Sequence, residues 1–236
     1  MLSNFKQEWI IHQDEDIVVI NKPAGVLSVA DGYNSELPYL RTILEPEFGR
    51  LFIVHRLDKD TSGVIVLARN EIAHRFLNLQ FDQRTIRKKY SALILGSPPW
   101  NEYSINLPVT INGDKAHRTR IFPGRGKPSQ TDILLIKGWK TAAHISAVPH
   151  TGYTHQIRAH LSTIGYPILF DKLYTPPEKK PLATDFIIST RIDPSIQRTM
   201  LHASEINFTH PESGKFNHFQ APLPDDMLCV IDILNI

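Results

Sequence analysis

The sequence is poor in cysteine, with Cys229 as the single example among 236 residues. A disulfide within the chain is therefore excluded, and so is a metal site built from several cysteines. One unpaired cysteine fits a reducing compartment, so we expect a cytoplasmic protein.

Long apolar runs are also missing. None reaches the roughly 18–20 residues that a membrane-spanning helix needs. The N-terminal stretch MLSNFKQEWIIHQDED has no apolar core followed by a cleavage site, so we expect neither a signal peptide nor a membrane span. The glycines fit neither GxGxxG nor a Walker sequence, which gives a nucleotide cofactor no support.

Strong charge of one sign is absent as well, because the formal net charge is only +2. Positive side chains are nevertheless concentrated in the stretch from Asn112 to Pro128, here called the basic segment, and in a second group just before it. The basic segment contains Lys115, Arg118, Arg120, Arg125 and Lys127, and the second group is Arg84, Arg87, Lys88 and Lys89. Such groups suit phosphate contacts. An exposed loop and a helix C-terminus explain the same pattern, so charge alone does not choose between them.

Apolar spacing predicts alternating strands and helices without regular crossover helices. Strands are expected at 16–21, 63–68, 90–95, 132–136, 143–148 and 200–208, and helices at 35–48 after Ser35, at 70–84 after Asn70 and at 154–164 after Thr154. We therefore predict an α+β fold with a large, mainly antiparallel or mixed sheet.

Three polar segments stand at the start of these elements. They are HRLDKDTSG at 55–63, RKKY at 87–90 and HTGYTHQIRAH at 150–160. A lone aspartate such as Asp58 is usually a turn or cap residue. The histidines His150, His155 and His160 are five apart and so lie about 140° apart around a helix. They are interpreted as hydrogen-bonding or packing residues, and no metal site is predicted.

These segments resemble, in order, the motifs of the RluA family of pseudouridine synthases. HRLDKDTSG followed by VIVLAR is similar to the family's HRLD-x-x-TSG motif, and INKPAGVLSV, RKKYSALILG, GKPSQTD, HTGYTHQIRAHLSTIGYPILFDKLY and MLHASEINFTHP resemble its other motifs. Any one of these matches would be weak. The ordered set covers most of the chain and is specific. The resemblance implies one catalytic domain over residues 1–236, with flanking helices on the large central sheet, a central active-site cleft and no appended RNA-binding domain.

The resemblance implies a role for each matching residue. Asp58 corresponds to the catalytic aspartate, Tyr90 to the tyrosine that stacks on the target base, and Arg158 to the arginine that pairs with the catalytic carboxylate. The expected substrate-binding residues are Arg56, which would fill the place of the extruded nucleotide, together with His55, Thr61, Leu201 and Lys22. The RNA backbone is expected to contact Lys88, Lys89, Lys115, Arg118, Arg120, Arg125 and Lys127.

Two positions depart from the family pattern. Tyr153 stands where the family usually has arginine, and Phe170 stands where it usually has a glycine, before Asp171. A glycine at that turn would permit a positive φ, so Phe170 puts the local geometry in question. Neither position is catalytic in the family.

The implied reaction moves uracil from N1 to C5 attachment on its ribose, without redox change or net hydrolysis. Neither a cofactor nor a metal is therefore expected. We expect RNA, ribosomal or transfer, as the partner, and a monomer. Two other functions remain open: a glycosylase that releases uracil through one aspartate, and a catalytically silent RNA-binding protein or chaperone.

Overall fold

The computed structural model describes residues 5–114, 118–122, 124–190 and 192–236. Its contacts divide the chain into two compact units. Unit 1 contains residues 1–88 and 203–222, and unit 2 contains residues 89–202 and 223–236. The prediction of a single domain therefore stays a prediction, and each unit is described by itself.

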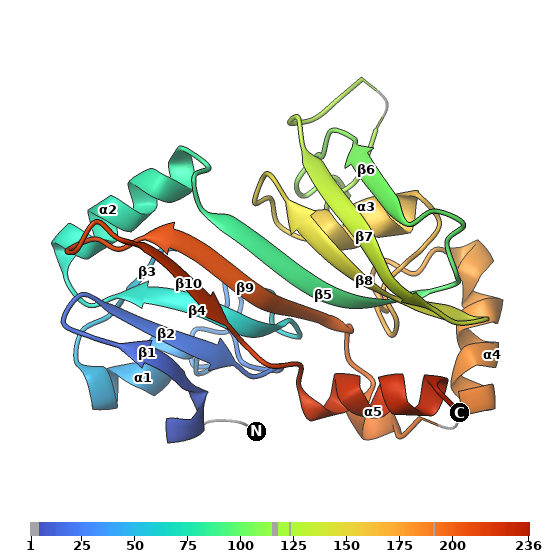
Figure 1. The fold of residues 1–236 in the computed structure, drawn as a ribbon, viewed down its shortest axis with the longest axis horizontal. Coiled ribbons are helices and arrows are strands. Elements are labelled where there is room, and N and C mark those ends of the chain that lie inside the picture. The colour runs from blue at the N-terminus through green and yellow to red at the C-terminus, as the bar shows by residue number, and fades with distance from the viewer. Residues whose placement is uncertain (1–4, 115–117, 123, 191) are drawn as a thin grey trace. The chain divides into compact units, whose positions relative to one another are not determined.

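Unit 1 is built on an antiparallel sheet (Figure 1). The strand order is β1-β2-β4-β9-β10, and β3 also pairs with β4. The strands are β1 (Ile10–Gln13), β2 (Ile17–Lys22), β3 (Phe52–Ile53), β4 (Ser62–Ala68), β9 (Leu201–Thr209) and β10 (Phe216–Gln220), preceded by the short 3-10 helix η1 (Gln7–Trp9). β4 is buried along its whole length, as the apolar run GVIVLA predicts.

Two helices accompany this sheet, α1 (Leu40–Phe48) and α2 (Glu71–Asp82), and α2 packs against β3 and β4. The predicted cap of α2 is confirmed, because the Asn70 side chain accepts a hydrogen bond from the Ala73 N–H at 2.8 Å. The predicted start of α1 at Ser35 is wrong. Leu37 precedes Pro38, which disfavours helical backbone at residue 37, and the helix begins only at Leu40.

Unit 2 holds a second antiparallel arrangement, in the order β5-β8-β7-β6. Its elements are β5 (Arg87–Leu95), β6 (Glu102–Asn106), β7 (Gln130–Gly138), β8 (Ala142–Pro149), α3 (Gln156–Thr163), η2 (Pro177–Lys179), α4 (Lys180–Thr190), η3 (Pro194–Ile196) and α5 (Asp225–Leu234). The first residues of β5 belong to unit 1, and the first residues of β9 belong to unit 2. After Tyr174 the chain runs into η2 and α4.

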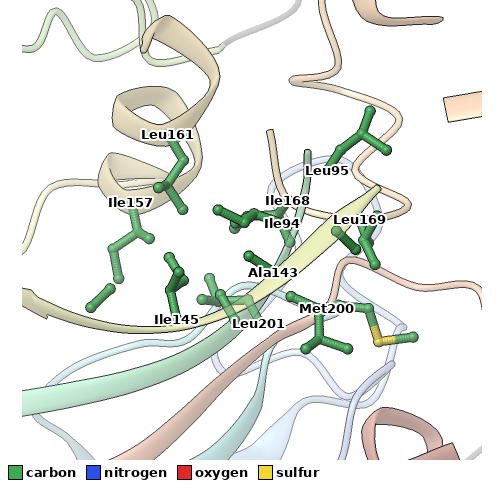
Figure 2. Close-up of a cluster of buried hydrophobic side chains, with 14 of the residues drawn as sticks. Ile94, Leu95, Ala143, Ile145, Ile157, Leu161, Ile168, Leu169, Met200 and Leu201 are labelled. Atoms are coloured by element: carbon green, nitrogen blue, oxygen red, sulfur yellow. The ribbon is translucent and has the colours of Figure 1, made fainter. Parts of the chain in front are cut away.

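The core of unit 2 lies between α3 and the strands. Figure 2 shows Ile157 and Leu161 on α3 pointing toward Ile145 and Ala143 of β8. These four side chains are buried. The burial orients α3, so that the polar residues between its apolar positions have fixed directions.

The predicted α+β class with mainly antiparallel pairing is confirmed by these elements. The predicted central cleft stays a prediction. Within the described ranges, no helix is both long enough and apolar enough to cross a membrane.

We predict that Gly63→Ala severely destabilises the protein. Gly63 has φ +113, and a Cβ there would lie 2.6 Å from the Ala203 nitrogen and closer still to its carbonyl oxygen. Since main chain must shift and the backbone angle is strained, the free energy of unfolding should fall by about 3 kcal/mol or more. Urea unfolding measures this. Gly32→Ala, where a Cβ meets nothing, is the control. Equal stability of the two variants would contradict the close approach of β9.

Candidate functional site

The predicted site residues divide between the two units. Asp58, Arg56, His55, Thr61 and Lys22 belong to unit 1. Tyr90, Arg158 and Leu201 belong to unit 2. Each group is built up separately below.

In unit 1 the motif loop alternates in exposure. Arg56 is exposed, Leu57 is buried and Asp58 is partly buried. Such alternation is typical of extended backbone, in which residues two apart, such as Arg56 and Asp58, point to the same side. The Ser28 hydroxyl fixes the buried member, since it donates to the Leu57 carbonyl at 2.8 Å and accepts from the Leu57 N–H at 3.1 Å.

Lys22 binds the backbone of the same loop. Its side chain has no exposed surface, and its ammonium donates to the carbonyls of Pro23, Val26 and Lys59 at 3.0, 2.8 and 3.2 Å. The Lys59 carbonyl also accepts from the Gly25 N–H at 2.8 Å. Lys22 thus supports the backbone of this loop, and one of the carbonyls that it binds, that of Lys59, directly follows Asp58. The predicted contact of Lys22 with substrate stays a prediction.

His55 replaces a missing strand partner. β3 pairs with β4 only at Leu67 and Ala68, and the chain then leaves the ladder. At that point His55 Nε2 accepts a hydrogen bond from the Val66 N–H at 3.1 Å. The imidazole also stacks on Phe81, with ring centroids 4.8 Å apart. Burial, together with the nearby charge of Lys88, lowers the pKa of His55 to about 3. The ring therefore stays neutral and keeps accepting.

In unit 2 the centre of the arrangement is Arg158. Its Nε donates to Asp171 Oδ2 at 2.7 Å and its Nη2 donates to Asp171 Oδ1 at 3.0 Å. Asp171 has no exposed surface, and Arg158 is 9% exposed. Asp171 Oδ1 also accepts from the Leu173 and Tyr174 N–H groups, each at 3.1 Å. The carboxylate thus holds the guanidinium in one orientation.

Asp171 carries no predicted role, although it stands within a quoted motif. The signal was the unusual residue before it. Phe170 has φ +60, which confirms that this turn uses the conformation that a glycine would adopt without strain. The ring of Phe170 contacts Phe186 on α4, with centroids 6.1 Å apart, and this packing helps to hold the strained turn.

Helix α3, which carries Arg158, is fixed by hydrogen bonds at its N-terminus. The predicted cap, Thr154, is wrong: His155 occupies the cap position with φ +54 and makes no capping bond with its side chain. Gln156 fixes the turn instead. Its Oε1 accepts from the Thr151 hydroxyl at 2.7 Å and from the Tyr153 N–H at 3.2 Å, and its Nε2 donates to the Gln130 carbonyl at 3.0 Å.

The three motif histidines make hydrogen bonds, as expected. His160 is fully buried, with Nδ1 2.9 Å from the Thr131 hydroxyl and Nε2 3.0 Å from the Leu107 carbonyl. His150 contacts Asp132 at 2.5 Å, and His155 contacts the Tyr174 hydroxyl at 3.1 Å.

The other predicted residues of unit 2 differ in exposure. Tyr90 is partly buried, and the residues of β5 that follow it are fully buried. Leu201 is 4% exposed and belongs to the apolar core. In unit 1, Thr61 is 2% exposed. The expected contacts of Leu201 and Thr61 with a substrate stay predictions.

Described residues of the basic segment form short β-bridges, two of them to residues that precede the segment. The N–H and carbonyl groups of Val109 and Lys127 pair, as do those of Thr110 and Arg120. Lys127 Nζ lies 5.7 Å from the ring centroid of Tyr153, so the aromatic ring that replaces an arginine here attracts a neighbouring cation. Lys115 lies outside the described residues.

One cluster in the described part of the chain has the geometry to hold a metal: Asp14, Asp16 and His210 in unit 1. Its hydrogen bonds argue for a protein network. His210 Nδ1 accepts from the N–H groups of Glu212 and Ser213 at 3.3 and 3.2 Å. Nε2 therefore carries the proton and donates it to Asp14 Oδ2 at 3.0 Å. A metal ligand needs that nitrogen unprotonated.

We predict that Asp171→Asn lowers the free energy of unfolding by about 3–5 kcal/mol, because the buried Arg158 loses its counter-charge. Urea denaturation measures the loss. Asp226→Asn is the control, since Asp226 also binds an arginine, Arg198, through two bonds. The Asp226 side chain is 22% exposed against 0% for Asp171, so its loss should cost less. Equal costs would show that burial is not what makes the Asp171 pair important.

A second prediction concerns pH and His55. In the unfolded chain a histidine gains its proton near pH 6.5, whereas the folded protein resists protonation of His55 down to about pH 3. Stability from this group is therefore complete above pH 6.5 and is lost as pH falls below it, by about 1.4 kcal/mol per pH unit. Urea unfolding at pH 7.5 and 5.5 should show a larger loss for the parent protein than for His55→Gln. Identical losses would contradict an imidazole that the fold keeps neutral.

Comparison with known proteins identifies the family. The family model for RNA pseudouridylate synthase matches residues 16–163. The chain is 34% identical over 220 residues to the dual-specificity RNA pseudouridine synthase RluA of Escherichia coli K12, covering 92% of this chain and 94% of that protein. It is 37% identical over 217 residues to the ribosomal large subunit pseudouridine synthase C of Buchnera aphidicola subsp. Schizaphis graminum, covering 91% of this chain and 67% of that protein.

Solved structures share the fold. Human RNA pseudouridylate synthase domain containing 4 superimposes with a TM-score of 0.78 at 24% identity, over 96% of this chain and 92% of that one. Human RNA pseudouridylate synthase domain containing 1 gives 0.72 at 24% identity, over 96% and 94%. By family match, sequence identity and fold, this chain belongs to the RNA pseudouridylate synthases, which are isomerases that act on RNA.

Proposed function

We propose that this protein converts uridine to pseudouridine in a structured ribosomal or transfer RNA, with Asp58 as nucleophile or general base. The observation that carries the proposal is the support given to the Asp58 loop. Ser28, Lys22 and His55 fix the backbone on both sides of it, while Asp58 itself is not fully buried. A carboxylate held on a rigid backbone suits a reaction that needs precise placement.

The reaction balances within one nucleotide. The bond from N1 of uracil to C1′ of the ribose breaks, and a bond from C5 to C1′ forms. C5 then releases its proton to solvent, and N1 gains one. Asp58 would act either as a nucleophile, forming a bond to the substrate that breaks again before the product is released, or as a general base that takes up a proton and returns it. Nothing in the balance calls for an oxidant or for water as a reactant.

The remaining residues are assigned supporting roles. The target base must leave the helix stack before C1′ and C5 can be reached, and Tyr90 would then stack on it, which is worth about 1–3 kcal/mol per base. Arg56, exposed two residues before Asp58, would occupy the vacated place as a planar cation. Arg158 would supply the positive charge that favours an ionised carboxylate, with Asp171 holding its Nε and Nη2.

The substrate class is supported by the relatives. One is named a dual-specificity RNA pseudouridine synthase and another a ribosomal large subunit pseudouridine synthase. We propose a short stem-loop, because structured RNA is recognised largely through shape and exposed bases. Arg118, Arg120, Arg125 and Lys127 of the basic segment, together with Lys88 and Lys89, would contact its backbone. Lys88 is the weakest of this set, since burial lowers its pKa. A cytoplasmic monomer is part of the proposal.

The test uses RNA labelled with tritium at uridine C5. The parent protein should release tritium to solvent, because C5 loses its hydrogen, whereas Asp58→Asn should release none above background. Asp60→Asn, an exposed acid two residues away, is the matched control and should retain most of the activity.

Three results would contradict the proposal. Equal release by the parent and Asp58→Asn would remove Asp58 from its role. Free uracil among the products would indicate a glycosylase. RNA binding without any release by the parent would indicate a silent RNA-binding protein.

A further inference from the structure

We propose that Tyr174 is a positioning residue that links the basic segment to Arg158, so that RNA bound by the basic segment is aligned with Arg158. The inference rests on the proposed function and extends it. Its ring faces the arginine, and its hydroxyl faces the basic segment, both inside unit 2.

The ring side of Tyr174 completes the surroundings of Arg158. The Arg158 guanidinium carbon lies 4.9 Å from the Tyr174 ring centroid, within the range of a cation–π contact. The backbone N–H of Tyr174 donates to the same Asp171 oxygen that receives Arg158 Nη2. The Tyr174 carbonyl accepts from the Ser162 hydroxyl of α3 at 2.6 Å. Tyr174 is thus fixed to Arg158, to its carboxylate and to its helix.

The hydroxyl side fixes the basic segment. The Thr119 N–H donates to the Tyr174 hydroxyl at 2.7 Å, and Thr119 is 1% exposed. The Thr119 hydroxyl donates to the Thr154 carbonyl at 2.5 Å. Because the Tyr174 hydroxyl also lies 3.1 Å from His155 Nδ1, it can accept from the segment and donate to the cap of α3. Burial raises the pKa of Tyr174 to about 12, which keeps that proton in place.

The residues beside Thr119 are the segment's arginines. Arg118 and Arg120 flank it in the chain, and Arg118 Nη1 donates to the Leu173 carbonyl at 3.2 Å. Arg118 and Thr119 of the basic segment are thus hydrogen-bonded to Leu173 and Tyr174. A phosphate bound by these arginines would therefore be positioned relative to Arg158 through Tyr174. The Tyr174 ring contacts Arg158, and its hydroxyl binds Thr119.

Two substitutions separate the two ends. Tyr174→Phe keeps the ring but leaves the buried Thr119 N–H without its acceptor. Tyr174→Leu removes the ring as well. For Tyr174→Phe we expect the KM for a stem-loop RNA to rise about tenfold, with a much smaller change in kcat. For Tyr174→Leu we expect kcat at saturating RNA to fall at least about tenfold in addition. Tyr166→Phe changes a partly buried tyrosine of unit 2; it is the control and should change neither constant.

Amide hydrogen exchange at Thr119 gives a readout independent of activity. Exchange should accelerate in Tyr174→Phe and stay slow in Tyr166→Phe. An unchanged KM together with unchanged exchange at Thr119 would overturn the link to the basic segment. An unchanged kcat in Tyr174→Leu, or kcat and KM changing in parallel in both Tyr174 variants, would reduce Tyr174 to a packing residue. Absence of tritium release from the parent would instead count against the proposed function, and the exchange measurement would still test the link.

Discussion

The ion pair between Arg158 and Asp171 is the interaction on which the rest of unit 2 depends. Both groups are almost completely removed from water, and burying two charges is costly unless their geometry and remaining hydrogen bonds are satisfied. The surrounding structure satisfies them with two backbone N–H groups on Asp171 and an aromatic face on Arg158. Each member of this pair follows a residue with strained backbone, since His155 lies three positions before Arg158 and Phe170 directly precedes Asp171. Strain of this kind persists where neighbouring contacts impose it.

Unit 1 solves a different problem, which is to hold a polar loop rigid without covering its central carboxylate. It uses one buried ammonium, one buried hydroxyl and one neutral imidazole, each bonded to backbone. Gly63 then lets β9 approach the end of the loop more closely than any side chain would permit. The loop is thus fixed from its backbone, and Arg56 and Asp58 keep exposed surface.

Much of this arrangement could be predicted from the sequence, because some signals are local. Asn70 followed by helical spacing predicts α2, and an uninterrupted apolar run predicts β4. The start of α1 could also have been placed from the sequence, since Leu37 precedes a proline. The cap of α3 could not, because Gln156 reaches across to strand residues that spacing does not connect to it.

The site shows the same limit. A family motif predicts Asp58 and Arg158 as site residues, but burial decides what neighbouring residues do. Lys22 is predicted to contact substrate, and in the structure it is a buried support of the loop. Asp171 and Tyr174 lie in the motif that begins at His150. Their hydrogen-bond partners, Arg158 and Thr119, lie 13 and 55 positions away from them in the sequence. Such contacts depend on tertiary packing, which the order of residues does not reveal.

The most direct test of the account is a crystal structure of Asp58→Asn bound to a stem-loop RNA that the parent protein modifies. The account predicts a target uridine swung out of the helix with its base on the Tyr90 ring, the Arg56 side chain in its place, and Arg158 still bonded to both oxygens of Asp171. A uridine that stays stacked in the RNA, or an Arg158 that is no longer hydrogen-bonded to Asp171 in the complex, would contradict this arrangement.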